Sequence, residues 1–297
     1  MSAAVPPRHL LLALAVVAVW GSNFVVIKFA LATLPPLFLA ALRFALALFP
    51  ALLFIRRPAV PWSRLAAYGL LIGAGQFGLL FVAMDGRITP GLASLVVQTQ
   101  VFFTVGLAML LDRERVRPLQ WLAMALAAAG LAVIGLHTDG QTTFAGLALV
   151  LLAGLSWAAG NQVARGSGRV DMLGYMVWSS AFAIPPLLAL SLWLEGPARI
   201  GQGLAAADAA TWAAVVWQAA GNALFGYASW AWLLARHPAA AIAPLALGVP
   251  VFGMAASAAW LGEPLPAWKL GAAALVMVGL ALNLLAPRLL ALARGRA

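Results

Sequence analysis

The sequence predicts an all-α integral membrane protein: ten transmembrane helices in two inverted five-helix repeats, with both termini in the cytoplasm. This prediction rests on the composition, the spacing of apolar runs, and residues that recur half a chain apart. Of 297 residues, 64% are hydrophobic and 9% are charged, and the mean hydropathy is +0.99. Such a chain has too little polar surface to cover a water-soluble protein of this size.

Apolar stretches of about 20 residues, the length that crosses a bilayer as a helix, follow one another along the chain. The ten predicted helices are 9–31, 35–54, 65–84, 90–111, 117–137, 143–163, 172–194, 209–234, 239–261 and 266–286. Their connections are mostly short, so we expect no soluble domain. No stretch alternates with the period of two that a membrane-spanning strand requires, which excludes a β-barrel.

The formal net charge of +10 comes from residues scattered over short connections, which argues against nucleic acid as a partner. With the N-terminus inside, most basic residues fall on the cytoplasmic side: Arg8, Arg56, Arg57, Arg64, Arg113, Arg115, Arg117, Arg165, Arg169, Arg236, Arg288, Arg294 and Arg296. The opposite side holds fewer basic residues and most of the acids: Arg87, Arg199, Lys269, Asp85, Asp139, Glu195, Asp208 and Glu263. The positive-inside rule therefore places both termini in the cytoplasm.

Paired residues about half a chain apart indicate an internal duplication. The pairs are Glu114 with Glu263, Gly130 with Gly279, Trp20 with Trp157, Lys28 with Arg165, and Thr89-Pro90 with His237-Pro238. The offset is 149 at the glutamates and 137 at the tryptophans, and a longer connection at 195–208 than at 55–63 accounts for most of the difference. We interpret the two glutamates as marks of the repeat rather than site residues.

The duplication divides the chain into a first repeat, 1–140, and a second, 141–297, of five helices each. An odd number of helices makes the second repeat enter the membrane from the opposite side. Inverted repeats are the architecture of alternating access, in which a site near the membrane midplane opens to one side and then the other. The alternatives are a duplicated scaffold without a passage and a channel.

Enzymatic function is not expected. The sequence contains no cysteine, no phosphate-binding glycine motif, no histidine cluster and no paired carboxylates within a predicted helix. Catalysis at a buried site requires such groups. We therefore expect no enzyme activity, no metal and no cofactor.

Amide side chains lie inside predicted helices 1, 3, 4, 6 and 8, where they are costly unless they face another helix, a cavity or water. Helices 5 and 10 are almost entirely apolar, so we place them at the periphery. Residues three or four apart share a helix face, as Trp20 and Asn23 do. The predicted substrate-cavity residues are Trp20, Asn23, Arg43, Gln76, Phe77, Gln100, Trp157, Asn161, Gln218, Asn222 and Tyr227. For each amide, hydrogen bonding between helices is the alternative.

Arg43 is the most unusual of these residues because no Asp or Glu lies inside a predicted helix to pair with it. One hypothesis is that Arg43 attracts a substrate carboxylate or binds backbone carbonyl groups. Snorkelling or a structural hydrogen bond is the alternative.

Alternating access requires some helices to bend, and proline or glycine within a helix permits bending. The predicted hinges are Pro50, Pro185, Pro186, Pro244, Gly248 and Pro250, with static kinks as the alternative. Proton-coupled carriers generally need an acid or histidine within the membrane. All such residues lie at connections or helix ends here, so we expect facilitative transport.

Several motifs spread over the whole chain resemble one known family. They are Val19-Trp20-Gly21-Ser22-Asn23-Phe24, Pro35-Pro36-Leu37, Leu42-Arg43-Phe44, Gly91-Leu92-Ala93-Ser94-Leu95-Val96, Gln98, Gln100-Val101-Phe102-Phe103-Thr104, Ser156-Trp157-Ala158-Ala159-Gly160-Asn161, Ala243-Pro244-Leu245 and Val249-Pro250-Val251. These motifs resemble the EamA family of the drug/metabolite transporter superfamily. In detail they resemble bacterial inner-membrane exporters of O-acetylserine and cysteine and, more distantly, the YddG-type amino-acid exporters.

The resemblance implies ten helices in two inverted repeats, cytoplasmic termini, and efflux of amino acids and related metabolites across the bacterial inner membrane. The expected partners are a small-molecule substrate and the lipid bilayer, with the chain a monomer or a homodimer. Export of nucleosides or other metabolites on the same fold, and a role in lipid handling or assembly, are the alternatives.

Overall fold

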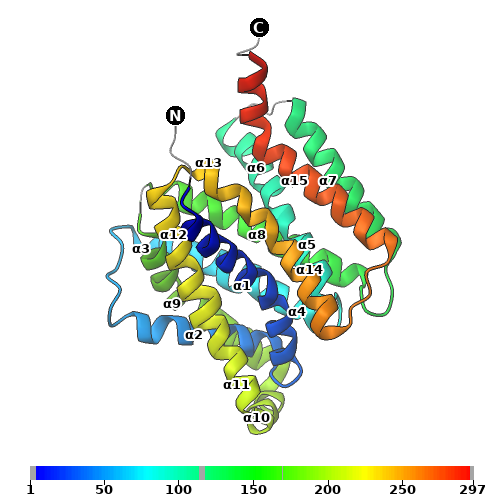
Figure 1. Cartoon of the computed structure of the whole chain (residues 1–297). Coiled ribbons are helices and arrows are strands. Elements are labelled where there is room, and N and C mark those ends of the chain that lie inside the picture. The colour runs from blue at the N-terminus through cyan, green and yellow to red at the C-terminus, as the bar shows by residue number, and fades with distance from the viewer. Residues whose placement is uncertain (1–4, 114–117, 169, 295–297) are drawn as a thin grey trace.

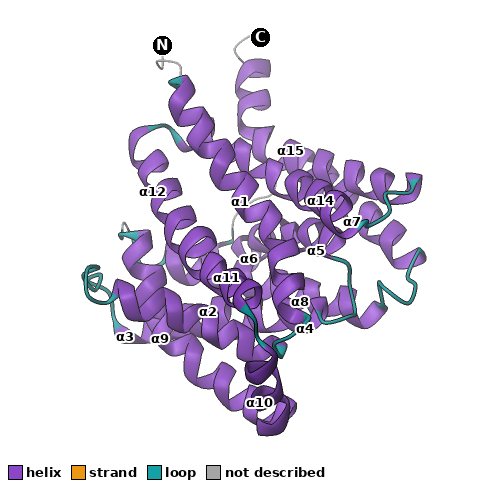
Figure 2. Cartoon of the chain, turned by 60° about the horizontal axis from the view of Figure 1, so that its bottom comes forward, coloured by secondary structure: helices purple, strands orange, loops and turns teal. Residues whose placement is uncertain are grey.

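The computed structural model describes residues 5–113, 118–168 and 170–294, so Glu114 lies outside the described residues. Throughout this described part the chain is helical and forms no strand, which confirms the all-α class. The helical elements of the described residues follow one another in ten continuous runs separated by short connections (Figure 1, Figure 2).

The first half of the chain forms five of these runs, two of which change helix type along their length. The elements are α1 (Pro7–Leu31); α2 (Pro36–Ala51); α3 (Trp62–Tyr68), the π-helix η1 (Gly69–Gly78) and α4 (Leu79–Met84); α5 (Pro90–Val96), the 3₁₀-helix η2 (Val97–Thr99) and α6 (Gln100–Asp112); and α7 (Pro118–Leu136). Proline opens α1, α2 and α5, where its missing N–H has no helical partner to lose.

The second half also forms five runs. The elements are α8 (Phe144–Arg165); α9 (Met172–Leu190), the π-helix η3 (Ser191–Glu195) and α10 (Gly196–Ala206); α11 (Ala209–Val216), the π-helix η4 (Trp217–Phe225) and α12 (Gly226–Arg236); α13 (Ala239–Ile242), the 3₁₀-helix η5 (Ala243–Leu247) and α14 (Gly248–Leu261); and α15 (Ala267–Arg294). Thr143, Asp171 and Asp208 cap α8, α9 and α11 by accepting hydrogen bonds from backbone N–H groups.

Eight helices among the described residues are long and apolar enough to cross a membrane, which makes the chain a multi-pass membrane protein. They are Pro7–Leu31, Trp62–Met84, Pro90–Leu111, Pro118–Leu136, Phe144–Arg165, Met172–Ala206, Ala243–Leu261 and Ala267–Leu285. The second predicted helix, 35–54, corresponds to α2, which is apolar but has only 16 residues. The eighth predicted helix, 209–234, corresponds to α11, η4 and α12, which are not among the eight and include the polar Gln218 and Asn222.

The connection predicted at 195–208 is largely helical, so the expectation of a long loop was wrong. Gly196, with a φ of +80°, turns the chain after η3, and α10 follows. Gly203 lets α10 approach the connection before α2, because a Cβ at this position would lie 2.8 Å from the Thr33 carbonyl oxygen. Gly-Pro at 196–197 and the glycines at 201 and 203 are typical of a loop, whereas packing against residues 33–35 favours a helix.

Departures from regular α-helix recur at corresponding places in the two halves. A π-helix begins at Gly69 in the third run and another at Trp217 in the eighth. A 3₁₀-helix interrupts the fourth run and the ninth. These fourth and ninth runs also end alike, with left-handed residues Arg113 (φ 55°) and Gly262 (φ 66°).

α7 and α15 pack mainly on each other along one edge of the molecule (Figure 1), in agreement with their predicted place at the periphery. Gly130 and Gly279 permit this close approach. A Cβ at Gly130 would lie 2.9 Å from the Ala272 carbonyl oxygen, and one at Gly279 would lie 2.6 Å from the Ala123 carbonyl oxygen. The contact is reciprocal, since Ala123 and Ala272 are themselves 149 positions apart.

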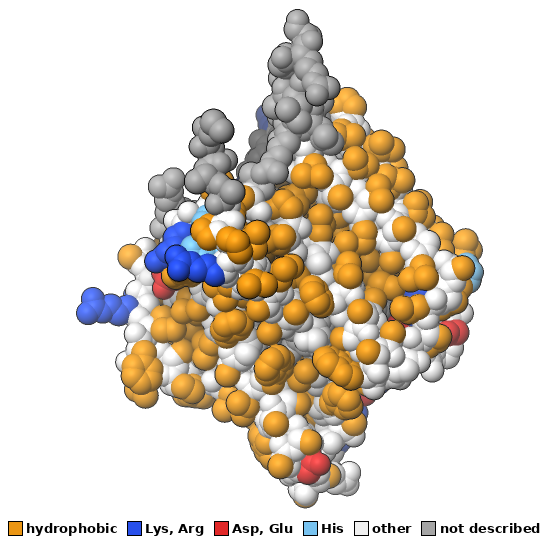
Figure 3. Space-filling view, in the orientation of Figure 1, with side chains coloured by type: hydrophobic (Ala, Val, Ile, Leu, Met, Phe, Trp, Pro, Cys, Tyr) orange, Lys and Arg blue, Asp and Glu red, His pale blue; other side chains and the backbone are white. Residues whose placement is uncertain are grey.

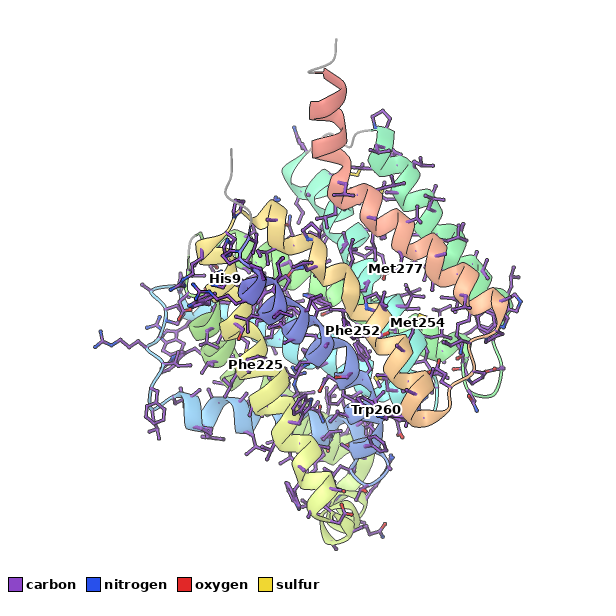
Figure 4. The ribbon with its side chains drawn as sticks, in the orientation of Figure 1. His9, Phe225, Phe252, Met254, Trp260 and Met277 are labelled. Atoms are coloured by element: carbon purple, nitrogen blue, oxygen red, sulfur yellow. The ribbon has the colours of Figure 1, made fainter. Side chains whose placement is uncertain are left out.

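The other runs surround the centre of the molecule. α1 packs on α14, α2 on α9, and α8 on η1 and α6. Gly21 brings α1 against α14, because a Cβ there would lie 2.5 Å from the Val249 carbonyl oxygen. On α14, Figure 4 labels Phe252 and Trp260, which are exposed, and Met254, which is buried, so this helix has one packed face and one outer face.

Both ends of the chain lie at the same end of the molecule (Figure 1). At this end His9 of α1 approaches α12, as Figure 4 shows, and its Nδ1 lies 2.7 Å from His237 Nε2. In Figure 3, hydrophobic side chains cover most of the visible face, and the largest group of Lys and Arg atoms lies near the N-terminal end. Asp and Glu atoms show mainly at the lower tip and the right edge of that view.

Candidate functional site

The centre of the molecule holds a buried guanidinium. Arg43, on α2, is only 2% exposed. Its Cζ lies 3.6 Å from the centroid of the Phe77 ring and 5.1 Å from that of Phe44, and its Nη2 donates a hydrogen bond of 3.3 Å to Asn222 Oδ1. The faces of the two rings attract the cation because their quadrupoles are negative there.

These contacts leave the charge of Arg43 without a counter-ion. Among the described residues no carboxylate pairs with it, and its Nε and Nη1 have no hydrogen-bond partner. Arginine stays protonated in proteins, and an unpaired charge away from water is costly. A cationic group that keeps two open donors in the core is suited to binding an anion.

Trp20 brings the first helical run to Asn222, and its ring lies beside Tyr227 and Trp230 of the eighth. The indole Nε1 of Trp20 donates a hydrogen bond of 3.1 Å to the backbone oxygen of Asn222. The ring centroids of Trp20 and Tyr227 are 5.9 Å apart, and Trp230 lies 5.2 Å from Trp20. The Trp20 hydrogen bond thus joins α1 to η4 through the Asn222 backbone, while the Asn222 side chain binds Arg43.

Three more predicted amides are buried on the elements that meet at Arg43. Asn23 on α1 is 3% exposed, Gln76 on η1 is 4% exposed, and Gln218 on η4 is fully buried. Within the described part of the chain, Asn23 Oδ1, Gln76 Oε1 and both polar atoms of the Gln218 side chain lack a hydrogen-bond partner. Buried polar atoms are normally paired, so each of these amides has capacity for a further hydrogen bond.

Gln100 and Asn161 form a separate amide pair. Asn161 Nδ2 on α8 donates a hydrogen bond of 3.1 Å to Gln100 Oε1 on α6, and Thr104 Oγ1 donates to the Gln100 carbonyl oxygen at 2.8 Å. Trp157 is partly buried against the core one turn from Asn161. Neither amide bonds to Arg43 in the described residues, so the structure divides the predicted cavity set between two places.

The predicted hinge residues occupy several kinds of backbone. Pro50 is exposed in the last turn of α2, and Pro185 and Pro186 lie within the unbroken helix α9. Pro244 is the second residue of the 3₁₀-helix η5, and Gly248 and Pro250 lie in the first turn of α14. A 3₁₀ segment within a longer helix is a frequent mark of a hinge. Of the second, seventh and ninth runs, which carry the predicted hinge residues, the ninth is therefore the best placed to bend.

Glu263 has a structural role that its interpretation as a mark of the repeat did not predict. The Glu263 carboxylate is 8% exposed and accepts from four groups: Lys269 Nζ at 3.0 Å, Thr89 Oγ1 at 2.6 Å, the Gly91 backbone N–H at 2.9 Å, and the Ser257 hydroxyl. It thereby ties the α14–α15 connection to the beginning of α5. Lys269 is predicted on the same side of the membrane as Glu263 and only six residues away, so the sequence could have suggested this ion pair.

Burial raises the pKa of the Glu263 carboxyl, but hydrogen bonds from Ser257, Thr89, Gly91 and Lys269 outweigh burial and hold the pKa below the usual glutamate value. Glu195 has a related structural role. Its two oxygens accept from the backbone N–H groups of Leu37 (2.7 Å) and Phe38 (3.1 Å) at the beginning of α2. The negative charge of this carboxylate also interacts favourably with the positive, N-terminal end of the α2 helix dipole.

Comparisons with known proteins identify the family. The model of the EamA-like transporter family matches residues 8–136 and 144–285. A protein of Salmonella typhimurium named a probable amino-acid metabolite efflux pump is 44% identical over 92% of this chain and 93% of its own length. An Escherichia coli protein of the same name is 41% identical over the same shares.

A solved structure described as the crystal structure of a protein covers 95% of this chain and 99% of its own length, with a TM-score of 0.61 at 21% identity. At this identity the likeness concerns the fold alone. The family match confirms the resemblance read from the motifs, and it agrees with the expectation of a transporter rather than an enzyme. From the two matched segments and the relatives aligned along nearly its whole length, the chain belongs to the EamA-like transporter family.

Proposed function

We propose that this protein exports amino acids and related small metabolites by alternating access, with the substrate carboxylate bound to Arg43. The observation that carries the proposal is the buried, unpaired guanidinium, whose Nε and Nη1 face no acceptor in the described residues. The relatives named as efflux pumps for amino-acid metabolites support the substrate class.

The chemical groups on α1, α2, η1 and η4 suit a zwitterion. Arg43 supplies donors for a carboxylate, and the amide groups of Asn23, Gln76 and Gln218 supply carbonyl oxygens for an ammonium group. Phe77 and Trp20 contribute apolar surface for a side chain. Among the described residues no carboxylate bonds to this cluster, so a substrate without an anionic group gains little from it.

The proposed topology is ten membrane crossings in two inverted repeats, 1–140 and 141–297, with both termini in the cytoplasm of a bacterial inner membrane. Its support is the family model matching twice, the reciprocal contact of Gly130 and Gly279, and the recurrence of π and 3₁₀ segments. The termini at one end of the molecule agree with an even number of crossings. Transport is proposed to be facilitative, with the ninth run as a hinge.

The test is counterflow in proteoliposomes with labelled L-serine, L-cysteine, L-leucine and L-phenylalanine, with uridine and a fluorescent phospholipid as comparison substrates. We expect exchange of at least one amino acid, independent of an imposed proton gradient. Movement of uridine or phospholipid without any amino acid would contradict the proposed substrate class. Strict dependence on a proton gradient would contradict the facilitative mechanism alone.

A further inference from the structure

A cavity lies at the end of the molecule opposite the termini, which we call the far end. Its volume is about 400 Å³, within the range of small-molecule sites. The end of α1, the connection before α5, the connection before α8, and the end of α14 line it. The lining residues that matter here are Lys28, Thr89, Gln141, Ser257 and Glu263.

Glu263 adds no free negative charge to this cavity. Its Oε1 accepts from Thr89 and Lys269, and its Oε2 accepts from Gly91 and Ser257, so its ionic partner is already in place. Two nearby acids are also engaged: Asp85 pairs with Arg199 at 3.2 Å, and Asp139 Oδ1 accepts from the Gln141 backbone N–H at 2.8 Å.

Of the two charged residues in the cavity lining, Glu263 pairs with Lys269, whereas Lys28 has no ionic partner among the described residues. Within the described residues its ammonium makes one hydrogen bond, to the Met84 carbonyl oxygen at the long distance of 3.5 Å. An ammonium has three donors, so Lys28 has capacity for an anion. The Thr89 and Ser257 hydroxyl groups donate to Glu263 and keep lone pairs that can accept from a substrate ammonium.

The cavity lies farther toward the far end of α1 than Asn23, because the cavity residue Lys28 follows Asn23 on this helix. Asn23 and Lys28 are five residues apart, about 7.5 Å along a helix at 1.5 Å per residue. At about 100° per residue the two side chains lie about 140° apart around α1, so Lys28 is nearer the far end but on another face of the helix than Asn23.

We propose that the far-end cavity is a second binding site for carboxylate-bearing zwitterions, in which Lys28 receives the substrate carboxylate after Arg43 releases it. This inference rests on the proposed function. With the proposed topology the far end faces away from the cytoplasm, so Lys28 binds the substrate on its way out.

The test uses the absence of cysteine from the chain, because a thiol introduced at one position then reacts alone. Lys28→Cys is reconstituted and assayed for export of whichever amino acid of the panel the wild type moves fastest. The cationic reagent 2-aminoethyl methanethiosulfonate restores an ammonium at position 28, and the anionic 2-sulfonatoethyl reagent places a negative charge there. Arg199→Cys, at an exposed far-end cation, is the matched control.

We expect Lys28→Cys to export at least fivefold more slowly than the wild type, with recovery after the cationic reagent and further loss after the anionic one. Equilibrium binding of the same amino acid in detergent should change less than twofold, because Arg43 is intact. Arg199→Cys should export at the wild-type rate before and after both reagents.

Equal export by unmodified Lys28→Cys and by both modified forms would overturn the second site while leaving the proposed function intact. Lys28→Arg guards against a folding defect, since it keeps the charge and is expected to export within twofold of the wild type. If the wild type itself moves no amino acid of the panel, the proposed function fails, and the second site fails with it.

Discussion

The Arg43 cluster depends on individual contacts that can be removed one at a time. Arg43 lies over Phe77, its Nη2 bonds to the Asn222 side chain, and the Asn222 backbone in turn accepts from Trp20. The Trp20 indole N–H thus reaches the Arg43 guanidinium through Asn222. Removing the indole N–H is expected to weaken substrate binding by displacing Asn222.

Trp20→Phe removes the hydrogen bond to the Asn222 backbone oxygen while keeping an aromatic ring. Loss of one hydrogen bond of this kind costs about 1 kcal/mol, or roughly a fivefold weaker affinity. Equilibrium binding of the exported amino acid in detergent measures the change. Trp121→Phe, at an exposed tryptophan of α7, is the control and should bind as the wild type does. Unchanged affinity in Trp20→Phe would show that the indole does not support the site.

Glu263 gives the fold a pH dependence at the far end. Because its pKa is lowered in the folded protein, its contribution is fully present above the usual glutamate pKa and is lost as the pH falls through the lowered value. Glu263→Gln should unfold at a lower temperature than the wild type at pH 7, by a free energy of about 1–3 kcal/mol. The difference between the two melting temperatures should shrink as the pH falls below the usual glutamate pKa of about 4.3. A constant difference from pH 7 to pH 3 would contradict this assignment.

At the scale of elements, the α7–α15 pair depends on its two reciprocal glycines. A leucine at Gly130 or Gly279 has no room, since even a Cβ would approach backbone atoms of the facing helix within 3 Å. Gly130→Leu and Gly279→Leu should each destabilise the protein by about 1–3 kcal/mol, the usual cost of overpacking. Gly271→Leu, also on α15 but facing open space, is the matched control. Thermal unfolding in detergent compares the three, and equal behaviour of all of them would exclude this interface.

The ninth run is where bending is expected, because η5 interrupts it and Pro244 is the second residue of η5. Pro244→Ala allows a regular α-helix through this segment, so we expect the turnover number in counterflow to fall several-fold while equilibrium binding holds. Pro118→Ala, at the first residue of α7, removes a proline outside the predicted hinges. If Pro244→Ala and Pro118→Ala both turn over at the wild-type rate, the hinge assignment is wrong.

For the whole molecule, the sequence was sufficient for the class of fold because hydropathy and helix length are local properties. The burial of the polar residues on α1, α2, η1 and η4 was also predictable, since a polar residue in hydrocarbon must face something other than lipid. Of these residues, Arg43 and Asn222 meet in a hydrogen bond. Gln100 and Asn161 instead pair with each other, a choice that depends on which helices are neighbours.

Contacts between segments far apart in the chain could not be predicted from the sequence. Glu263 and Thr89 are 174 positions apart, and nothing in either segment alone indicates that they meet. The helix α10 depends on the surface it packs on, which a reading of Gly and Pro as loop formers does not include. Glu114, the predicted counterpart of Glu263, lies outside the described residues, so its role stays a prediction.

Recognition of the substrate carboxylate by Arg43 is the step on which the proposed export depends. Equilibrium binding of the exported amino acid and of its carboxamide would be measured for the wild type and for Arg43→Gln. We expect the wild type to bind the amino acid at least tenfold more tightly than the amide, and Arg43→Gln to bind both equally and weakly. A folded Arg43→Gln protein that keeps the wild-type preference for the amino acid would contradict the account.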